Sequence, residues 1–339
     1  MLRPTDFFRY VIALASLLAF AAHAQGHVAD LQEREAQRWL RKIPLAAQTL
    51  DYSGTFLHQR SDRVYTSRIT HVVQGQDELE KLEVLDGRPR EYVRMNDEVV
   101  YYAPDKKAML VEPRATRVGF PALMFTDPAQ LSSFYRIYFD KAGQVAGYPC
   151  QVLVLVPRDN LRYGYRLWIE KSSGLLLKMQ TLADDQVIEQ IGFTQLVLGN
   201  IPLQSARPTH NEVQDWRYER RALQHIEMPG LKVGFLPSGF TQIASVRSSI
   251  PFAASDVTDK GAQAVKAREV VQIVFSDGLA AISIFLQPGS PTLGHVSAQQ
   301  GSIHIIGKRF DDFSLIIVGE IPALAIKQVA DSIEFQSIK

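Results

Sequence analysis

Basic residues alternate along one short segment of the chain in a way that suits anion binding. If the segment Arg88–Met95 is a β-strand, four side chains share one of its faces: Arg88, Arg90, Tyr92 and Arg94. Guanidinium groups bind phosphates and carboxylates through paired N–H donors. This face is therefore a candidate contact for a lipid phosphate or an acidic partner peptide. The alternative is a solvated strand face beside Glu91 and Glu98.

Residues that could perform catalysis or bind a metal do not gather in the sequence. Phosphate-loop, nucleophile-elbow and zinc-protease patterns are missing, and the eight histidines are widely spaced. The acidic pairs Asp184-Asp185 and Asp311-Asp312 fall in predicted hairpin turns, where Asp is favoured because it bonds the backbone. We therefore predict a protein that is not an enzyme, with no catalytic residues, no metal site and no cofactor. A hydrolase with a dispersed site is the alternative.

Composition and the N-terminus restrict the function further. The chain of 339 residues carries 37 Lys and Arg against 36 Asp and Glu, a balance that argues against nucleic-acid binding. Arg3 and Arg9 precede and flank a short apolar run, and Ala22-His23-Ala24 forms a cleavage site. These features predict a signal peptide over residues 1–24 and a periplasmic location. The single cysteine, Cys150, excludes an intramolecular disulfide and suits a buried packing position.

The elements that must position any site are mostly strands. The stretch Val145–Leu182 predicts an antiparallel meander whose first strand is apolar on both faces, and strands separated by turn residues also fill Asp51–Glu112. We place a helix from Asp30 to about Lys42, ended or redirected by Pro44, and a helical insertion over Phe120–Tyr135. If the sheet curls, the insertion would cover its concave side. The candidate lining of a lipid cavity there is Phe120, Phe125, Leu131, Phe134, Tyr163, Tyr165 and Trp168. The alternative is that these side chains fill an ordinary core.

The length suffices for two cores, and the apolar pattern weakens between them. We predict a first domain over residues 25–200, a linker over 201–229 and a smaller α+β domain over 230–339. Arg217, Arg220 and Arg221 in the linker are a second candidate contact for an anion or a partner. In the second domain, Val270–Phe275 and Leu279–Leu286 flank Asp277-Gly278 as a hairpin.

Several segments resemble the RseB/MucB family in order and spacing over nearly the whole mature chain. These are DYSGTF, GRPREYVRMNDEVVYYAPD, FPALMFTDPAQLSSFY, AGYPCQVLVLVPRDNLRYGYRLWIEKSSGLLLKMQTL, FSDGLAAISIFL and IIVGEIPALAIKQVADSIE. The resemblance implies an N-terminal unclosed antiparallel β-barrel with covering helices, like those of the lipoprotein carriers LolA and LolB. It also implies the smaller C-terminal α+β domain.

The same resemblance implies a function in envelope-stress signalling. Members of the family bind the periplasmic domain of a membrane anti-sigma factor, shield it from the site-one protease, and are thought to sense lipid, lipopolysaccharide or mislocalised lipoprotein. The expected partners are thus that periplasmic domain and acyl chains, with a second copy of the chain as a further candidate. A periplasmic carrier of lipoprotein or lipid is the alternative function, but it gives no reason for the second domain.

Overall fold

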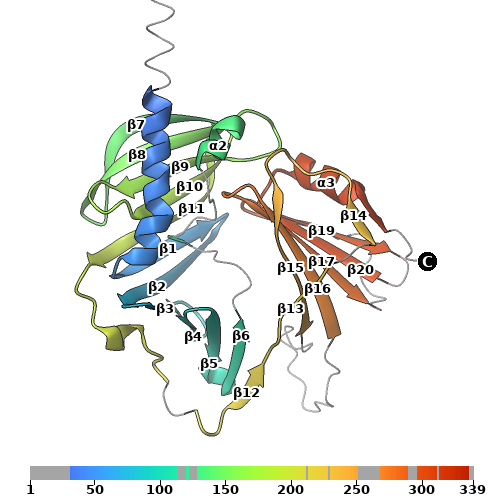
Figure 1. Cartoon of the computed structure of the whole chain (residues 1–339), viewed down its shortest axis with the longest axis horizontal. Helices are drawn as coiled ribbons and strands as arrows, with labels where there is room; N and C mark the ends of the chain where they lie inside the picture. The colour runs from blue at the N-terminus through green and yellow to red at the C-terminus, as the bar shows by residue number, and fades with distance from the viewer. Residues whose placement is uncertain are drawn as a thin grey trace, which may run out of the picture.

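A large unclosed β-sheet forms the first half of the protein (Figure 1). The computed structural model describes residues 31–113, 120–121, 128–210, 213–227, 230–250, 268–288, 296–310 and 313–335. Twelve strands of this part follow the order β12-β6-β5-β4-β3-β2-β1-β11-β10-β9-β8-β7, and the two end strands do not pair with each other. All neighbours are antiparallel except β12 and β6, which are parallel. The strands are β1 (Tyr52–Arg60), β2 (Arg63–Gln74), β3 (Asp77–Val84), β4 (Arg90–Met95), β5 (Glu98–Ala103), β6 (Ala108–Pro113), β7 (Tyr135–Val145), β8 (Tyr148–Pro157), β9 (Gly164–Glu170), β10 (Leu176–Ala183), β11 (Gln186–Leu198) and β12 (Arg217–Arg220).

Short turns with left-handed residues join these strands, as the sequence predicts. Ser61, Asn96 and Asp184 each adopt a φ near +54° in the turns that follow β1, β4 and β10. Short polar side chains tolerate this conformation because they bond the local backbone. The pair Asp184-Asp185 is thus confirmed as a hairpin turn, whereas Asp311-Asp312 lies outside the described residues.

Two helices cover the same end of the large sheet. The N-terminal helix (residues 31–49, blue in Figure 1) and α2 (Pro128–Phe134) pack on the strands around β8 and β9. Their shared cluster of buried side chains includes Ala36, Leu40, Ile43, Leu131, Tyr135, Leu153, Leu155, Tyr165, Leu167, Ile169 and Leu176. The part of the predicted helical insertion that the structure describes as helix, α2, therefore does cover the sheet. Side chains of the two helices bury much of the apolar surface on this face of the sheet.

Two boundaries of the helical predictions are wrong. The N-terminal helix does not end at Pro44 but continues to residue 49, and Ile43, Ala46 and Ala47 are all buried. Burial on both sides of Pro44 stabilises the helix against the loss of one N–H donor. Tyr135 does not end α2 as a helical residue but begins β7, an edge strand that the sequence analysis did not predict.

A second sheet lies beside the first (Figure 1). Its seven strands within the described residues run in the order β13-β15-β16-β17-β20-β19-β18, and the helix α3 (Ala323–Asp331) packs on its core. The predicted hairpin across Asp277-Gly278 is confirmed as β16 and β17. The strands are β13 (Gln224–His225), β15 (Thr241–Ile250), β16 (Arg268–Ser276), β17 (Ala281–Pro288), β18 (Val296–Gln300), β19 (Ile303–Phe310) and β20 (Phe313–Gly319), with a separate pair β14 (Leu231–Val233) and β21 (Ile333–Phe335).

The segment between the two sheets is not free of regular structure. It contains the short 3-10 helix η2 (Leu203–Ala206), the edge strand β12 of the first sheet and the edge strand β13 of the second. A further 3-10 helix, η1 (Pro104–Lys106), connects β5 to β6. The chain is therefore hydrogen-bonded to both sheets as it passes from one to the other.

Candidate functional site

A buried ion pair joins the two sheets. Arg162, just before β9, directs its Nη1 to the Oδ2 of Asp277 at 3.1 Å, and neither side chain is exposed to solvent. The Nη2 of Arg162 donates to the carbonyl oxygen of Ser238 at 2.7 Å, and its Nε donates to Asp159. Burial lowers the pKa of Arg162, but the hydrogen bond to Asp159 and the charge of Asp277 outweigh it, so the pKa is raised. Arg162 is thus fully charged and held by groups from both sheets.

Aromatic side chains surround this ion pair on the side of the first sheet. The guanidinium carbon of Arg162 lies 4.9 Å from the centroid of the Phe134 ring, and the hydroxyl of Tyr135 donates to Asp277 at 3.2 Å. Both rings come from the junction of α2 and β7. Leu279, in the turn after Asp277, packs into the cluster beneath the N-terminal helix. The turn 277–279 of the second sheet is thus inserted into the first.

The close approach of the sheets requires glycine at position 239. Gly239 has a φ of +89°, and a Cβ placed on it would overlap the ring of Phe134. We expect Gly239→Ala to lower the free energy of unfolding by about 2 kcal/mol, through overpacking and backbone strain. Thermal unfolding should show Gly75→Ala to be milder, since Gly75 has a φ of +65° but nothing within 4 Å. Adding Phe134→Leu should recover part of the loss, and a Gly239→Ala variant no weaker than Gly75→Ala would contradict this account.

A second polar contact joins the sheets at Glu189 of β11. His58 and Arg60 reach its Oε1 at 2.5 and 2.8 Å, and Ser302 of the second sheet bonds its Oε2 through both its hydroxyl and its backbone N–H. Beside it, the N–H of Gly301 donates to the hydroxyl of Ser61 at 2.8 Å. Burial would raise the pKa of Glu189, but the hydrogen bonds from His58, Arg60 and Ser302 outweigh it and lower the pKa to about 2.

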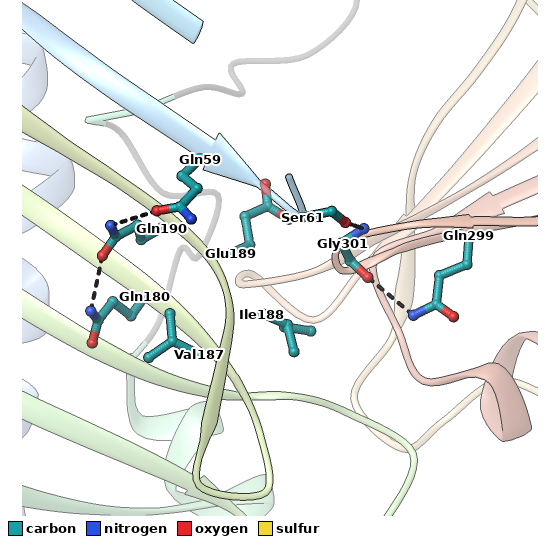
Figure 2. Close-up of a pocket in the computed structure, with 9 residues that line it drawn as sticks. All are labelled: Gln59, Ser61, Gln180, Val187, Ile188, Glu189, Gln190, Gln299 and Gly301. Carbon is teal, nitrogen blue, oxygen red and sulfur yellow. Dashed lines mark hydrogen bonds between the residues drawn. The ribbon is translucent and has the colours of Figure 1, made fainter. Parts of the chain in front are cut away.

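A cleft of about 630 Å³ opens next to this contact (Figure 2). On the side of the first sheet, the amide of Gln180 donates to Gln190 at 3.1 Å, and the amide of Gln190 donates to Gln59 at 3.0 Å. On the side of the second sheet, Gln299 donates to the carbonyl oxygen of Gly301 at 3.3 Å. Val187 and Ile188 complete the wall. The lining is polar and carries one charge, Glu189, which is already bound on both oxygens.

The predicted lipid-cavity residues separate into several environments. Phe120, Leu131 and Tyr165 lie under the two helices, and Phe120 packs on Phe56 and Phe193 with centroids at 5.4 and 5.1 Å. Phe134 packs against the same cluster and also faces Arg162 and Gly239 at the interface between the sheets. Phe125 lies outside the described residues.

The two remaining members of that set do not join the cluster. Tyr163 lines a different cleft, of about 810 Å³, which also includes Arg158, Leu182 and Pro322. Trp168 stands on the opposite face of β9 from Tyr165, where its ring is 4.8 Å from the Nζ of Lys178. Trp168 therefore packs against a different cluster from Tyr165, because strand residues of opposite parity face opposite sides of the sheet.

The arginines of β4 are paired with carboxylates. Arg90 contacts Asp105 at 2.5 Å, and Arg94 is buried against Glu78 and Glu80. Burial raises the pKa of Glu78, but His71 and Arg94 outweigh it and lower it to about 2. This arrangement favours a charge-balanced strand face over a free anion site, with Asp105, Glu78 and Glu80 as the balancing acids. Arg88 precedes the strand and is exposed.

The linker arginines lie on the outer strand of the first sheet. The side chain of Arg217 is 72% exposed, Arg220 pairs with Glu98 at 2.7 Å, and Arg221 lies 3.5 Å from Glu112. Arg217 and Arg220 thus present charge to solvent at the edge strand β12.

Sequence reasoning missed the residues that join the sheets. Arg162 and Asp277 are 115 positions apart, so no local pattern links them. The available signal was a charged residue inside an apolar meander, which calls for a buried partner. In the described part of the chain, no group of three or more His, Cys, Asp or Glu could hold a metal, and none of the helices found there is long and apolar enough to cross a membrane.

Comparison with known protein families identifies the family of this two-sheet protein. The family model of the MucB/RseB N-terminal domain matches residues 35–218, and that of the MucB/RseB C-terminal domain matches residues 226–334. The chain belongs to the MucB/RseB family. The resemblance drawn from sequence segments is thereby confirmed.

Relatives within the MucB/RseB family match most of the chain. The sigma factor AlgU regulatory protein MucB of Pseudomonas aeruginosa is 29% identical over 95% of this chain and 96% of its own length. The sigma-E factor regulatory protein RseB of Escherichia coli K12 is 24% identical over 87% of this chain and 89% of its own. The crystal structure of MucB in complex with MucA(peri) superposes with a TM-score of 0.65 at 26% identity, covering 89% of this chain and 99% of that one.

Proposed function

We propose that this protein is a periplasmic negative regulator that binds the periplasmic domain of a membrane anti-sigma factor and shields it from site-one proteolysis. The observation that carries the proposal is the likeness to MucB in its complex with MucA(peri), which extends over both sheets. A relative named as a sigma-E regulator matches over a similar share of the chain. The polar interface between the sheets supports the same function, because a binding protein needs its two halves held in a defined orientation.

The second sheet and the linker are the proposed main contacts for the partner. Arg217 and Arg220 project from β12, beside the point where the chain enters the second sheet. Exposed positive charges of this kind accelerate encounter with an acidic segment, and the effect weakens as salt is raised. Arg221 is half-buried against Glu112 and contributes less to this surface.

Release by a lipid or a mislocalised lipoprotein would act through α2. Leu131 of α2 is buried in the cluster that an acyl chain would have to enter, and Tyr135, the first residue of β7 directly after that helix, bonds Asp277 of the second sheet. A chain that displaced α2 would therefore disturb the ion pair between the sheets. The same apolar cluster is what favours the second candidate function, a periplasmic carrier of lipid or lipoprotein.

A titration tests the proposal directly. We expect the mature chain to bind the periplasmic segment of the anti-sigma factor, measured by fluorescence anisotropy, and to protect that segment from the site-one protease. The double variant Arg217→Gln/Arg220→Gln should bind more slowly at low salt, whereas Arg136→Gln, at an exposed position of the opposite edge strand β7, serves as the matched control. Binding without protection would contradict the shielding role.

The reciprocal effect of two ligands on each other's binding tests both release by lipid and the carrier hypothesis. If an acyl chain weakens binding of the anti-sigma segment, the segment must weaken acyl-chain binding by the same factor. A fluorescent fatty acid titrated with and without saturating segment measures this. Equal affinities in the two titrations would contradict release by lipid, and acyl-chain binding with no binding of the segment would favour the carrier.

A further inference from the structure

The four edges of the two large sheets differ in how they are protected against pairing with another chain. Open edges attract additional strands unless charge, a bulge or shortness prevents it. The edge strand β12 carries Arg217, Glu219 and Arg220, and β13 has only two residues. The edge strand β7 is interrupted by a register shift between Asp140 and Gly143. Each of these three edges therefore has a device that disfavours strand addition.

The fourth edge, β18, has none of these devices. Its sequence, VSAQQ, contains no charge and no proline, and it pairs with β19 in continuous register from Val296–Gly307 to Gln300–Ile303. Its first four side chains are exposed, including Val296 at 41%. No strand of the described residues pairs with its outer side. The backbone N–H and C=O groups on that side are available for a further strand.

The edge strand β18 leads into the cleft of Figure 2. Gln299 of β18 and Gly301 after it form one wall, and Gln59, Gln180 and Gln190 of the first sheet form the other. The Oε1 of Gln180 is buried and accepts no hydrogen bond from the described residues. Val187, at the same cleft, is 47% exposed. The cleft thus offers amide donors, an unused acceptor and an apolar patch to a ligand.

We propose that β18 and this cleft bind one extended, uncharged segment of the partner protein. The segment adds as a strand beside β18, and its end enters the cleft among the glutamines. An uncharged segment fits because Glu189 is already bound by His58, Arg60 and Ser302, and no other charge lines the cleft. The segment would contact both sheets at once. This inference rests on the proposed function, since it names the place where the anti-sigma factor binds.

A pair of proline variants tests strand addition with an internal control. Successive residues of a strand direct their N–H groups to opposite sides. One of Ser297→Pro and Ala298→Pro therefore removes a donor from the open edge, and the other removes a bond to β19. The melting temperature identifies the open-edge variant, because only that variant keeps all its bonds to β19 and melts like the wild type. We expect it to bind the anti-sigma segment at least about tenfold more weakly. Lys141→Pro on β7 should bind like the wild type.

Each outcome has a defined meaning. A folded open-edge variant that binds the segment as the wild type does would overturn the inference and leave the proposed function intact. A wild-type chain that fails to bind the segment would overturn both. If sedimentation showed a dimer that only the open-edge variant loses, with partner binding unchanged, the edge would belong to a second copy and the inference would be wrong.

Two further measurements do not depend on proline. Hydrogen exchange of the wild-type complex should show new protection of the amides of residues 296–300, and unchanged exchange there would overturn the inference even if both proline variants unfolded. In the cleft, Gln180→Leu removes the unused acceptor and should weaken binding severalfold, whereas Gln151→Leu, on β8 outside the cleft, should not. The ratio of the affinity of Gln180→Leu to that of Gln151→Leu should not change with salt, because the proposed contact is uncharged.

Discussion

Replacing Arg162 with methionine is expected to lower the free energy of unfolding by about 3–5 kcal/mol. The methionine would fill much of the volume of the arginine side chain but leave Asp277 without its counter-charge at a position with no solvent exposure. The carbonyl oxygen of Ser238 would lose its donor as well. Denaturant titration of the mature chain measures the loss.

The comparison variants separate burial from charge. Arg220→Met breaks an ion pair with Glu98 whose side chains are 56% and 43% exposed, and it should cost far less than Arg162→Met, because solvent screens an exposed pair. The double variant Arg162→Met/Asp277→Asn should be more stable than Arg162→Met, because it removes the uncompensated charge and keeps the side-chain oxygen that caps Leu279 and Ala280. Equal losses for Arg162→Met and Arg220→Met would contradict the account.

The carboxylate of Glu189 is expected to make the protein sensitive to acid. Its folded pKa is lowered from 4.5 to about 2, so the stabilisation is present above the unfolded value and is lost as the pH falls towards 2. That interval corresponds to about 3 kcal/mol. Glu189→Gln should therefore be less stable at neutral pH and lose less stability between pH 5 and pH 2. Unfolding curves at several pH values measure the slope.

Neighbouring charges around Glu189 define the control. His58 and Arg60 face it from β1, and its charge contributes, after burial, to the raised pKa of Glu320. Glu35→Gln, on an exposed position of the N-terminal helix, changes the net charge by the same amount without touching this group. If Glu35→Gln and Glu189→Gln altered the acid slope equally, net charge rather than the bound carboxylate would be responsible.

Local pattern accounts for the parts of the fold that could be predicted. The β10–β11 and β16–β17 hairpins follow from alternating apolar residues around Asp184-Asp185 and Asp277-Gly278, because turn chemistry and strand period act within a few residues. Edge strands were harder: β7 alternates only weakly, and β12 and β18 contain few apolar side chains because one side of each is open to solvent. The predicted domain limits at residues 200 and 230 remain predictions.

The candidate site could not be read from local pattern. Nothing near Arg162 indicates that Asp277 lies beside it, and nothing near Gln180 indicates that Gln299 forms the opposite wall of the cleft. Both facts depend on how two separately folded sheets pack. Packing also decides the end of the N-terminal helix. Pro44 disfavours helix locally, but the burial of Ile43 and Ala47 on the sheet overrides this effect.

The hydrogen-bonded path of the chain between the sheets limits how they can move. Arg220 is the last residue of β12 in the first sheet, and Gln224 is the first of β13 in the second. The connection from Arg220 to Gln224 spans at most about 14 Å when fully extended. Even with the ion pair of Arg162 broken, the sheets could not drift apart while β12 and β13 stay paired. They could only swing about this short hinge, so a signal that loosens the interface would change an angle rather than free one half from the other.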